Sequence, residues 1–405
     1  MSDLKVRNCT VWDVHYWKVS KGNEDDIAEP GKEGIINSST TGYTLGVKRV
    51  NISPDGRTTK LSVSKSGIYY VVWNGKKLDI LTEAEALKYP HSDDNKYLSK
   101  WFKTNSTWMS YLDGALTLDK FSIPGTHDSG TKKTGKGIAH TQNFDIDTQL
   151  EDGIRFLDIR LDGVTEFDSK LVVKHGCILC SLSFGDVLDS CKSFLKKNSE
   201  ETIIMLVDSC HCEVSIVCSD ADIANRFDDY LNKPEHKNLF YLGTEIPKLD
   251  AVRGRVVLFR RFKTNGSDNM GLNLSGDAWK DDQTFSLETP QGNVFQIEDQ
   301  YSEHNTPKKL KAVEANLNKA ISNPNDGKMF ITYNSISGKL TRTPYQYAWG
   351  GPGIAPVMNP SLKTYLHGKS GSQRFGTIML DFYNNRGSNN GIVEAIIRSN
   401  DGLKQ

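Results

Sequence analysis

Residues 121–131 read FSIPGTHDSGT, an apolar, strand-like start that runs into a Pro-Gly turn signal and then presents a histidine and an aspartate together. Farther along, residues 155–161 read RFLDIRL. Because side chains alternate between the two faces of a strand, Asp158 and Arg160 share one face of this segment. A third strand-like run, LVVKHG at 171–176, ends on His175. The stretch therefore predicts several strands with titratable groups near their ends.

The composition describes an ordinary globular protein with enough apolar residues for a sizeable core. The chain has 405 residues, of which 37% are hydrophobic and 25% charged, and this length can hold two domains. Lys+Arg and Asp+Glu are both 50, so the net charge gives no reason to expect a nucleic-acid partner. A contact with a membrane would have to rely on apolar or aromatic loops rather than on a polybasic run.

The N-terminus lacks the uninterrupted apolar core of a signal peptide, and no segment approaches the roughly 18 apolar residues of a membrane-spanning helix. We expect an extracellular protein whose signal has been removed, with a cytoplasmic protein as the alternative. Six of the seven cysteines fall between Cys177 and Cys218. Their spacing fits a structural zinc site poorly, which leaves one or two disulfides or reduced thiols; disulfides would favour secretion.

The first part of the chain has short β-type runs separated by Gly, Asn, Asp and Pro turns. This pattern predicts a small all-β, sandwich-like domain over residues 1–95, whose function the sequence does not reveal. We expect its aromatic residues to pack in its core rather than to form a binding face; they are Trp12, Tyr16, Trp17, Tyr69, Tyr70 and Trp73. A polar stretch around Pro90–Asn95 is interpreted as the linker to a second domain, residues 96–405.

Beyond the linker the sequence predicts about eight buried strands, several of them separated by helical segments. The strands are Phe121–Ile123, Phe156–Leu161, Leu171–His175, Thr202–Val207, Arg255–Phe262, Val294–Glu298, Met329–Tyr333 and Thr377–Phe382. This alternation is typical of a (β/α)8 TIM-like barrel, an α/β fold. The connection between the second and third strands is too short for a parallel crossover, so the barrel must be irregular there.

The active sites of such barrels lie at the carboxyl ends of the strands. Nearly every predicted strand delivers a polar or charged group at that end: His127 and Asp128, Asp158 and Arg160, His175, Asp208, Arg261, Asp299 with Tyr301, and Asp381. A single buried histidine is usually structural. Two histidines, arginines and several aspartates at one barrel mouth are hard to explain by structure alone, so we expect a catalytic site.

Two histidines with an arginine suit phosphoryl transfer. One imidazole removes a proton from the nucleophile, the other donates a proton to the leaving oxygen, and the guanidinium stabilises the charge on the phosphate oxygens. Asp128 and Asp381 are available to orient the two histidines. The acids are dispersed and an arginine lies among them, so no metal cluster is expected. When the nucleophile is a hydroxyl of the substrate itself, the product is a cyclic phosphodiester.

Four motifs, SIPGTHDSGT (122–131), GIRFLDIR (153–160), KHG (174–176) and ETIIM (201–205), resemble those of the bacterial-type phosphatidylinositol-specific phospholipase C family. The resemblance spans about Leu118 to Arg398. It implies an irregular barrel that cleaves phosphatidylinositol to diacylglycerol and inositol 1,2-cyclic phosphate, often with activity on glycosylphosphatidylinositol anchors. The partner implied is therefore lipid at a membrane surface, reached by peripheral contact, and we expect a monomer.

The resemblance also implies catalytic roles. His127 is similar to the general base, with Asp381 as its carboxylate partner, and His175 to the general acid, supported by Asp128. Arg160 matches the phosphate-binding arginine, which stands where a calcium-dependent branch of the family has an acid and a Ca²⁺ ion. The resemblance thus implies metal-independent catalysis without a cofactor.

Further residues match positions around the substrate. Asp158 is expected to orient the phosphate-binding arginine, Arg261 and Asp299 to bind inositol hydroxyls, and Tyr301 to stack on the ring. One departure is Asp208, which stands where the family commonly carries a lysine; a carboxylate accepts hydrogen bonds but cannot donate as an ammonium does. The same chemistry on another headgroup therefore stays an alternative, as does a noncatalytic protein that binds inositol lipids or glycosylphosphatidylinositol.

A second departure concerns membrane contact. Bacterial relatives present an exposed tryptophan in the loop that follows Gly338, whereas the corresponding segment here carries Tyr345, Tyr347 and Trp349. These aromatic side chains form an interfacial anchor or pack within the rim of the barrel.

Overall fold

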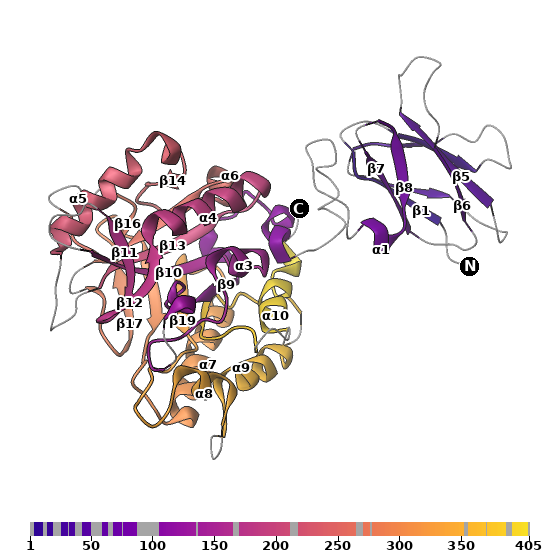
Figure 1. Ribbon diagram of the computed structural model, residues 1–405. Helices are drawn as coiled ribbons and strands as arrows, with labels where there is room; N and C mark the ends of the chain where they lie inside the picture. The colour runs from indigo at the N-terminus through magenta and orange to yellow at the C-terminus, as the bar shows by residue number, and fades with distance from the viewer. Residues whose placement is uncertain are drawn as a thin grey trace. The chain divides into compact units, whose positions relative to one another are not determined.

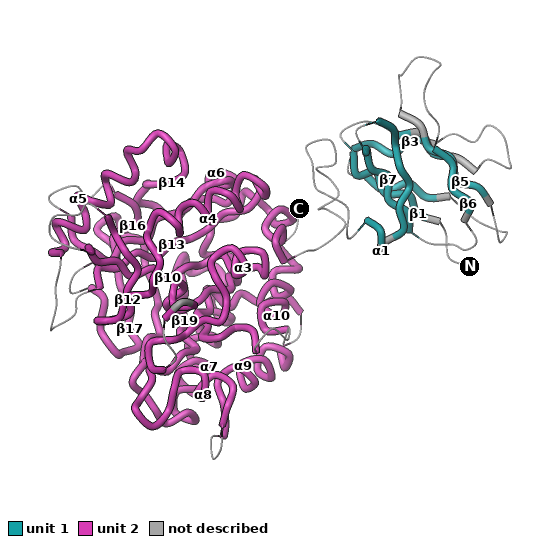
Figure 2. The backbone as a smooth tube through the Cα atoms, in the orientation of Figure 1, with its two compact units in different colours: residues 1–104 teal, residues 105–405 magenta. Residues whose placement is uncertain are grey.

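The computed structural model describes two compact units, residues 1–104 and residues 105–405 (Figure 2). Within them it describes residues 4–10, 14–18, 26–30, 32–36, 43–49, 59–63, 68–74, 76–86 and 105–403, the last range without 135–136, 165–169, 211–217, 265–269, 276–277, 352–354, 370 and 386–390. The predicted boundary at 95/96 and the predicted linker around Pro90–Asn95 lie outside the described residues.

The first unit consists of two four-stranded sheets. One has the order β4 (Glu33–Ile36), β1 (Leu4–Asn8), β7 (Ile68–Trp73), β8 (Leu78–Leu81), and the other the order β3 (Asp26–Ala28), β2 (Val14–Lys18), β5 (Tyr43–Arg49), β6 (Thr59–Val63). A short helix, α1 (Glu83–Ala86), follows β8. Apolar side chains from both sheets form one core, and Tyr16 and Tyr70 are buried. The predicted all-β, sandwich-like fold is confirmed. Tyr16 packs in this core, and Tyr70 packs in a second, smaller cluster with Cys9, Val72 and Ala86.

The second unit is built on a curled sheet (Figure 1). Its main path is β14 (Phe240–Tyr241), β15 (Val256–Arg260), β13 (Ile203–Ser209), β10 (Phe156–Gly163), β9 (Ile123–Thr126), β20 (Thr377–Leu380), β19 (Lys328–Tyr333), β18 (Val294–Glu298) and β17 (Thr284–Glu288). All neighbours along this path are parallel except β17 and β18. The predicted TIM-like α/β barrel is confirmed. It is irregular, because within the described residues the strands at the two ends of the path, β14 and β17, do not pair with each other to close the sheet.

The third predicted strand does not belong to the parallel path. β11 (Leu171–His175) lies antiparallel to β10 and pairs with β12 (Ile178–Ser183) in a hairpin. The physical reason is the short connection after β10, which cannot carry the chain back across the sheet for another parallel strand. As a result, His175 approaches the barrel mouth from a hairpin beside it.

Helices cover the outer side of the sheet (Figure 1). They are α3 (Ile146–Glu151), α4 (Phe184–Lys197), α5 (Asp220–Leu231), α6 (Leu249–Val252), α7 (Thr306–Ser322), α8 (Pro344–Trp349), α9 (Met358–His367) and α10 (Ile392–Arg398). Two of the longer ones begin with a capping box, Ser183 with Asp186 and Ser219 with Asp222, which satisfies backbone N–H groups at the helix start. No helix in the described part of the chain is long and apolar enough to cross a membrane.

The inner face of the barrel changes from apolar to polar toward the carboxyl ends of the strands. The rings of Phe156, Phe259 and Phe295 lie edge to face, with centroids 5.5–5.8 Å apart, and fill the interior. Asp158 and Arg160 follow Phe156 on the same face of β10. Gly125 allows β9 to lie close to this strand, since a Cβ there would come within 2.9 Å of the Cβ of Phe156. The apolar floor thus supports a charged mouth.

The cysteines that the structure describes do not form a zinc site. Cys177 is disulfide-bonded. Cys180, Cys191, Cys210 and Cys218 carry free thiols and are buried. The chain thus has a disulfide bond at the turn between β11 and β12, together with reduced thiols elsewhere.

Candidate active site

The ends of β9 and β20 bring His127 and Asp381 together. The two strands are parallel neighbours with Thr126 opposite Leu380, so the next residue of each lies side by side. Nδ1 of His127 is 2.8 Å from Oδ1 of Asp381, and both side chains are buried. With the Nδ1–H donating to this carboxylate, the ring is fixed with Nε2 toward the barrel mouth.

Asp128 lies at the centre of the charged groups. Its backbone has a φ of 44°, in the left-handed region that aspartate tolerates better than most residues. Oδ2 of its carboxylate lies 3.1 Å from Nε2 of His127 and 3.4 Å from Nε2 of His175, and Oδ1 lies 2.8 Å from Nε of Arg160. One carboxylate therefore faces both imidazoles and the guanidinium.

His175 is oriented by the backbone rather than by a carboxylate. Its Nδ1 lies 2.9 Å from the carbonyl oxygen of Ala139, to which the Nδ1–H donates. Its Nε2 faces Asp128, and a quarter of its side chain is exposed. The rings of His127 and His175 stand nearly perpendicular with centroids 6.3 Å apart. Both Nε2 atoms thus face the carboxylate of Asp128. A general acid and a general base that act on the same phosphate must face one position in this way.

The ionisation of this cluster follows from its geometry. Burial alone lowers the pKa of His127, but the carboxylates of Asp128 and Asp381 outweigh burial and raise it to about 9. Burial raises the pKa of Asp128, but the charges of Arg160, His175 and His127 outweigh it and lower the pKa to about 2. Without substrate, Asp128 is therefore an anion and His127 a cation at neutral pH.

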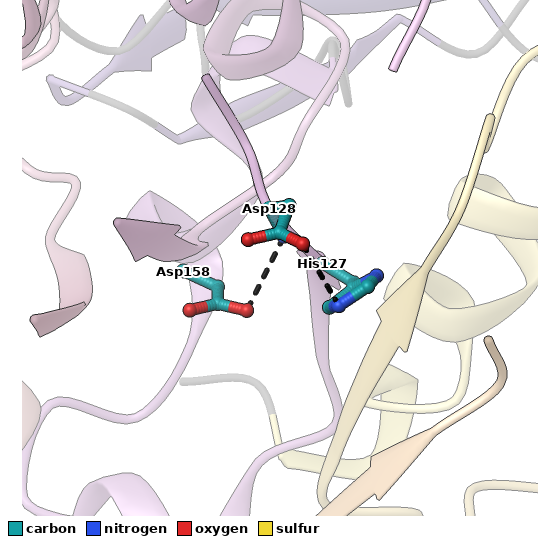
Figure 3. Close-up of side chains that lie close together, drawn as sticks. All are labelled: His127, Asp128 and Asp158. Atoms are coloured by element: carbon teal, nitrogen blue, oxygen red, sulfur yellow. Dashed lines mark hydrogen bonds and ion pairs between the residues drawn. The ribbon is translucent and has the colours of Figure 1, made fainter. Parts of the chain in front are cut away.

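His127, Asp128 and Asp158 form the group of described residues that could offer ligands to a metal ion, with ligand atoms within 4.8 Å of one another (Figure 3). The backbone N–H of Asp128 donates to Oδ2 of Asp158 at 3.2 Å. However, the guanidinium of Arg160 already lies against both carboxylates, at 2.8 Å from Asp128 and 3.4 Å from Asp158. The cation of this site is supplied by the chain itself, so the residues fit a metal ion poorly.

A second group of polar residues lies at the ends of β13, β15 and β18. Arg261 forms an ion pair with Asp208 at 3.0 Å, and its guanidinium lies 4.0 Å from the ring centroid of Trp279. The indole N–H of Trp279 donates to Oδ2 of Asp299 at 3.1 Å. Burial, only partly opposed by the charge of Arg261, raises the pKa of Asp299 to about 6. Arg260 is buried and donates to backbone carbonyls, so Arg261 is the residue that faces the site.

The ten predicted site residues thus fall into a catalytic half and a second half. The catalytic half contains His127, Asp128, Asp158, Arg160, His175 and Asp381, and the second half Asp208, Arg261 and Asp299. Tyr301 follows Asp299 closely, and its hydroxyl donates to Asp281 at 2.9 Å. These positions are facts of the structure, and the roles remain predictions.

Sequence reasoning missed three contributors. The carbonyl of Ala139 has no side-chain signature. Trp279 lies outside the predicted strands. It belongs to the second half because its ring contacts the guanidinium of Arg261 and its indole N–H donates to Asp299. Tyr333 is the last residue of β19, and the rule that polar residues at strand ends form the site could have found it.

Comparisons with known proteins agree with this geometry. A family model described as the phosphatidylinositol-specific phospholipase C X domain matches residues 118–262. The chain is 32% identical over 294 residues to a 1-phosphatidylinositol phosphodiesterase of Staphylococcus aureus (strain Newman), which covers 69% of this chain and 89% of the relative. It is 31% identical over 264 residues to a protein of the same name from Listeria monocytogenes, with 62% and 76% covered.

Solved structures give the same result. A phosphatidylinositol-specific phospholipase C from Staphylococcus aureus with an incorporated pentafluoro-Phe superposes with a TM-score of 0.64 and 29% identity, covering 73% of this chain and 98% of that one. The phosphatidylinositol-specific phospholipase C from Listeria monocytogenes superposes with a TM-score of 0.56 and 27% identity, covering 73% and 99%. The similarity extends over nearly the whole length of both.

Proposed function

The chain belongs to the phosphatidylinositol-specific phospholipase C family, and from this membership we propose that it cleaves phosphatidylinositol to diacylglycerol and inositol 1,2-cyclic phosphate. The observation that carries the proposal is the position of Asp128, whose carboxylate lies within 3.4 Å of Nε2 of both histidines while Arg160 contacts its other oxygen. Two proton-transfer groups and a phosphate-binding cation thereby surround one point.

In the proposed reaction, Nε2 of His127 takes the proton from the inositol 2-hydroxyl, and that oxygen attacks phosphorus. The bond from phosphorus to the diacylglycerol oxygen breaks, and the leaving oxygen takes a proton from Nε2 of His175. Arg160 stabilises the charge on the non-bridging oxygens, and Asp158 holds its guanidinium. These four groups are sufficient for the step without a metal ion.

Asp128 links the two proton transfers. Its charge keeps His127 protonated in the free protein, whereas a general base must be neutral. We propose that the arriving substrate displaces this carboxylate from Nε2 of His127 toward His175 and Arg160, which it also contacts. The pKa of His127 then falls, while the carboxylate stays beside Nε2 of His175, from which the leaving oxygen takes its proton.

The second half of the site is proposed to bind the inositol ring. Arg261 donates hydrogen bonds to ring hydroxyls, Asp299 accepts them, and Trp279 fixes the positions of both. Asp208 neutralises part of the charge of Arg261. A ring pocket with this ion pair instead of a further cation favours an inositol without additional phosphate groups.

The membrane contact is proposed to use aliphatic rather than aromatic side chains. The large apolar residues that are exposed in the described part of the second unit are Ile138, Val164, Ile178, Leu179 and Leu340. Ile138, Val164 and Leu340 follow the carboxyl ends of the parallel strands β9, β10 and β19. Ile178 and Leu179 begin β12, in the hairpin that also carries His175. The aromatic alternative finds no support, since Tyr347 is buried, Trp349 donates to the carbonyl of Phe382 and Tyr345 donates to Asn385.

Three finer proposals accompany this function. Glycosylphosphatidylinositol anchors contain the same inositol phosphodiester, and we propose that they are also substrates. We propose that the protein acts as a monomer, because each unit has its own core. The disulfide bond of Cys177 supports an extracellular location, where such bonds persist.

The proposed function is tested by incubating the purified chain with vesicles that contain phosphatidylinositol and with vesicles that contain only phosphatidylcholine. Release of diacylglycerol from the first and not from the second supports the proposal. His127→Ala and His175→Ala, each with an unchanged thermal midpoint, should lower turnover by about 10²- to 10⁴-fold. Equal cleavage of both lipids would mean that the protein does not select the inositol headgroup, and would favour the alternative of another headgroup as substrate.

A further inference from the structure

Tyr333 is a buried residue of the barrel mouth that the proposed mechanism does not use. It ends β19, and its side chain is 2% exposed. Its hydroxyl has no hydrogen-bond partner among the described residues. Buried phenols nearly always find a partner, so an orphaned hydroxyl at a strand's carboxyl end points to a ligand.

The surroundings of Tyr333 place it between the two halves of the site. Its ring lies edge-on to that of His127, with centroids 5.9 Å apart, and edge-on to that of Trp279, with centroids 6.4 Å apart. His127 belongs to the catalytic half, and Trp279 holds Arg261 and Asp299 of the second half. Tyr333 therefore contacts a residue of each half of the site.

The charges around Tyr333 keep its hydroxyl protonated. Burial, followed by the nearby carboxylates of Asp158 and Asp299, raises its pKa well above the usual value for tyrosine. Arg261 and Arg160 oppose this shift but do not cancel it. The hydroxyl is therefore protonated at neutral pH and can donate a hydrogen bond.

We propose that the Tyr333 hydroxyl binds the substrate by donating a hydrogen bond to a ring hydroxyl of the inositol, and so sets the position of the ring relative to His127. The inference rests on the proposed function, because an inositol phosphate is the ligand that would span both halves. The phosphate lies against Arg160, and the ring lies between Tyr333 and Arg261.

A purely structural role predicts a different behaviour. If Tyr333 only filled space between His127 and Trp279, phenylalanine would fill it equally well, and removal of the hydroxyl would change neither binding nor turnover. The fold gains nothing from a hydroxyl without a protein partner, so Tyr333→Phe should leave the thermal midpoint unchanged or raise it. Stability and binding therefore separate the two roles.

The test compares wild type and Tyr333→Phe by calorimetric titration with inositol 1,2-cyclic phosphate, together with steady-state turnover of phosphatidylinositol. We expect the Kd of the variant to rise by roughly 3- to 10-fold, with kcat/KM falling by a similar factor. Tyr365→Phe is the matched control, since it removes a hydroxyl that donates to Asn318 at 2.8 Å on the exposed surface. This control should leave Kd and kcat/KM unchanged.

Monodeoxy analogues of the cyclic phosphate identify the contact. For one analogue, wild type should have a higher Kd than for the parent compound. Tyr333→Phe should bind that analogue and the parent compound with equal Kd, since the variant already lacks the partner of the missing hydroxyl. A wild-type Kd for Tyr333→Phe, or an equal loss with every analogue, would overturn the inference while leaving the proposed function intact. If wild type neither binds nor forms the cyclic phosphate, both are wrong.

Discussion

Nδ1 of His127 and Oδ1 of Asp381 lie 2.8 Å apart, at the ends of two neighbouring parallel strands. Because the register of β9 and β20 places these residues side by side, the orientation of the proposed base is part of the fold. The carboxylate holds the ring in one tautomer and stabilises the imidazolium that forms during proton transfer.

Asp381→Asn keeps the shape of this contact but removes the charge. The variant should lose about 10²- to 10⁴-fold in kcat, with little change in KM, because the base is misoriented and its protonated form is less stable. Steady-state kinetics on phosphatidylinositol in detergent measure both constants. Asp326→Asn is the control, since Asp326 is an ion-paired carboxylate that holds Arg374 outside the site. A near-normal kcat for Asp381→Asn would show that the pair does not take part in catalysis.

The raised pKa of His127 makes stability depend on pH. The pKa is about 9 in the folded protein and about 6.5 in an unfolded chain, so the contribution is complete below pH 6.5 and is lost as pH rises through 9. The free energy of unfolding should fall over this window by up to about 3 kcal/mol. Urea unfolding of wild type and His127→Asn at a series of pH values measures it. Equal slopes for both proteins would mean that His127 is not the group that titrates.

The ion pair between Asp208 and Arg261 should affect binding of the ring more than chemistry. Asp208→Asn removes the charge that pairs with Arg261 and replaces one of two acceptor oxygens by an amide donor, so KM should change by several-fold while kcat stays near the wild-type value. Phosphatidylinositol and phosphatidylinositol 4-phosphate are compared as substrates. We expect the variant to accept the second lipid better, because the pocket becomes more positive. If the ratio of kcat/KM for the two lipids is the same in the variant and in wild type, Asp208 does not contribute to headgroup recognition.

The aliphatic rim can be tested apart from the chemistry. Leu179 and Leu340 have 55% and 102% of their surfaces exposed. Because burial of each leucine is worth about 1.5–3 kcal/mol, the double variant Leu179→Asp, Leu340→Asp should bind phosphatidylinositol vesicles at least roughly tenfold more weakly. Turnover of a short-chain, monomeric phosphatidylinositol should not change. Ile35→Asp, an equally drastic change in the first unit, is the control; wild-type vesicle binding by the double variant would place the contact elsewhere.

The sequence predicted the barrel and most of its mouth because both depend on local patterns. Apolar runs mark the buried strands, and polar residues within these strands or directly after them meet at one edge, as Asp158, Arg160 and Asp381 do. The antiparallel direction of β11 could not be read from its own residues, since it follows from the length of the connection before it. The short gap did predict that the barrel would be irregular at this place.

Other features depend on tertiary contacts that leave no local signal. Ala139 orients His175 through a backbone carbonyl, which any residue could supply. Trp279 enters the site from an irregular segment, and its role appears only when Arg261 and Asp299 are found on either side of it. The sequence left two alternatives for Tyr345, Tyr347 and Trp349 for a similar reason: only the structure shows that the indole N–H of Trp349 donates to the backbone carbonyl of Phe382.

The most direct test of the account follows the ³¹P NMR spectrum of phosphatidylinositol in detergent after addition of the protein, with excess chelator present. The account predicts that the resonance of the cyclic phosphodiester appears, and that it is absent with His127→Ala, since His127, His175 and Arg160 act without a metal ion. Activity that appears only when Ca²⁺ replaces the chelator would contradict the role of Arg160. No cyclic product under either condition would contradict the two-histidine mechanism itself.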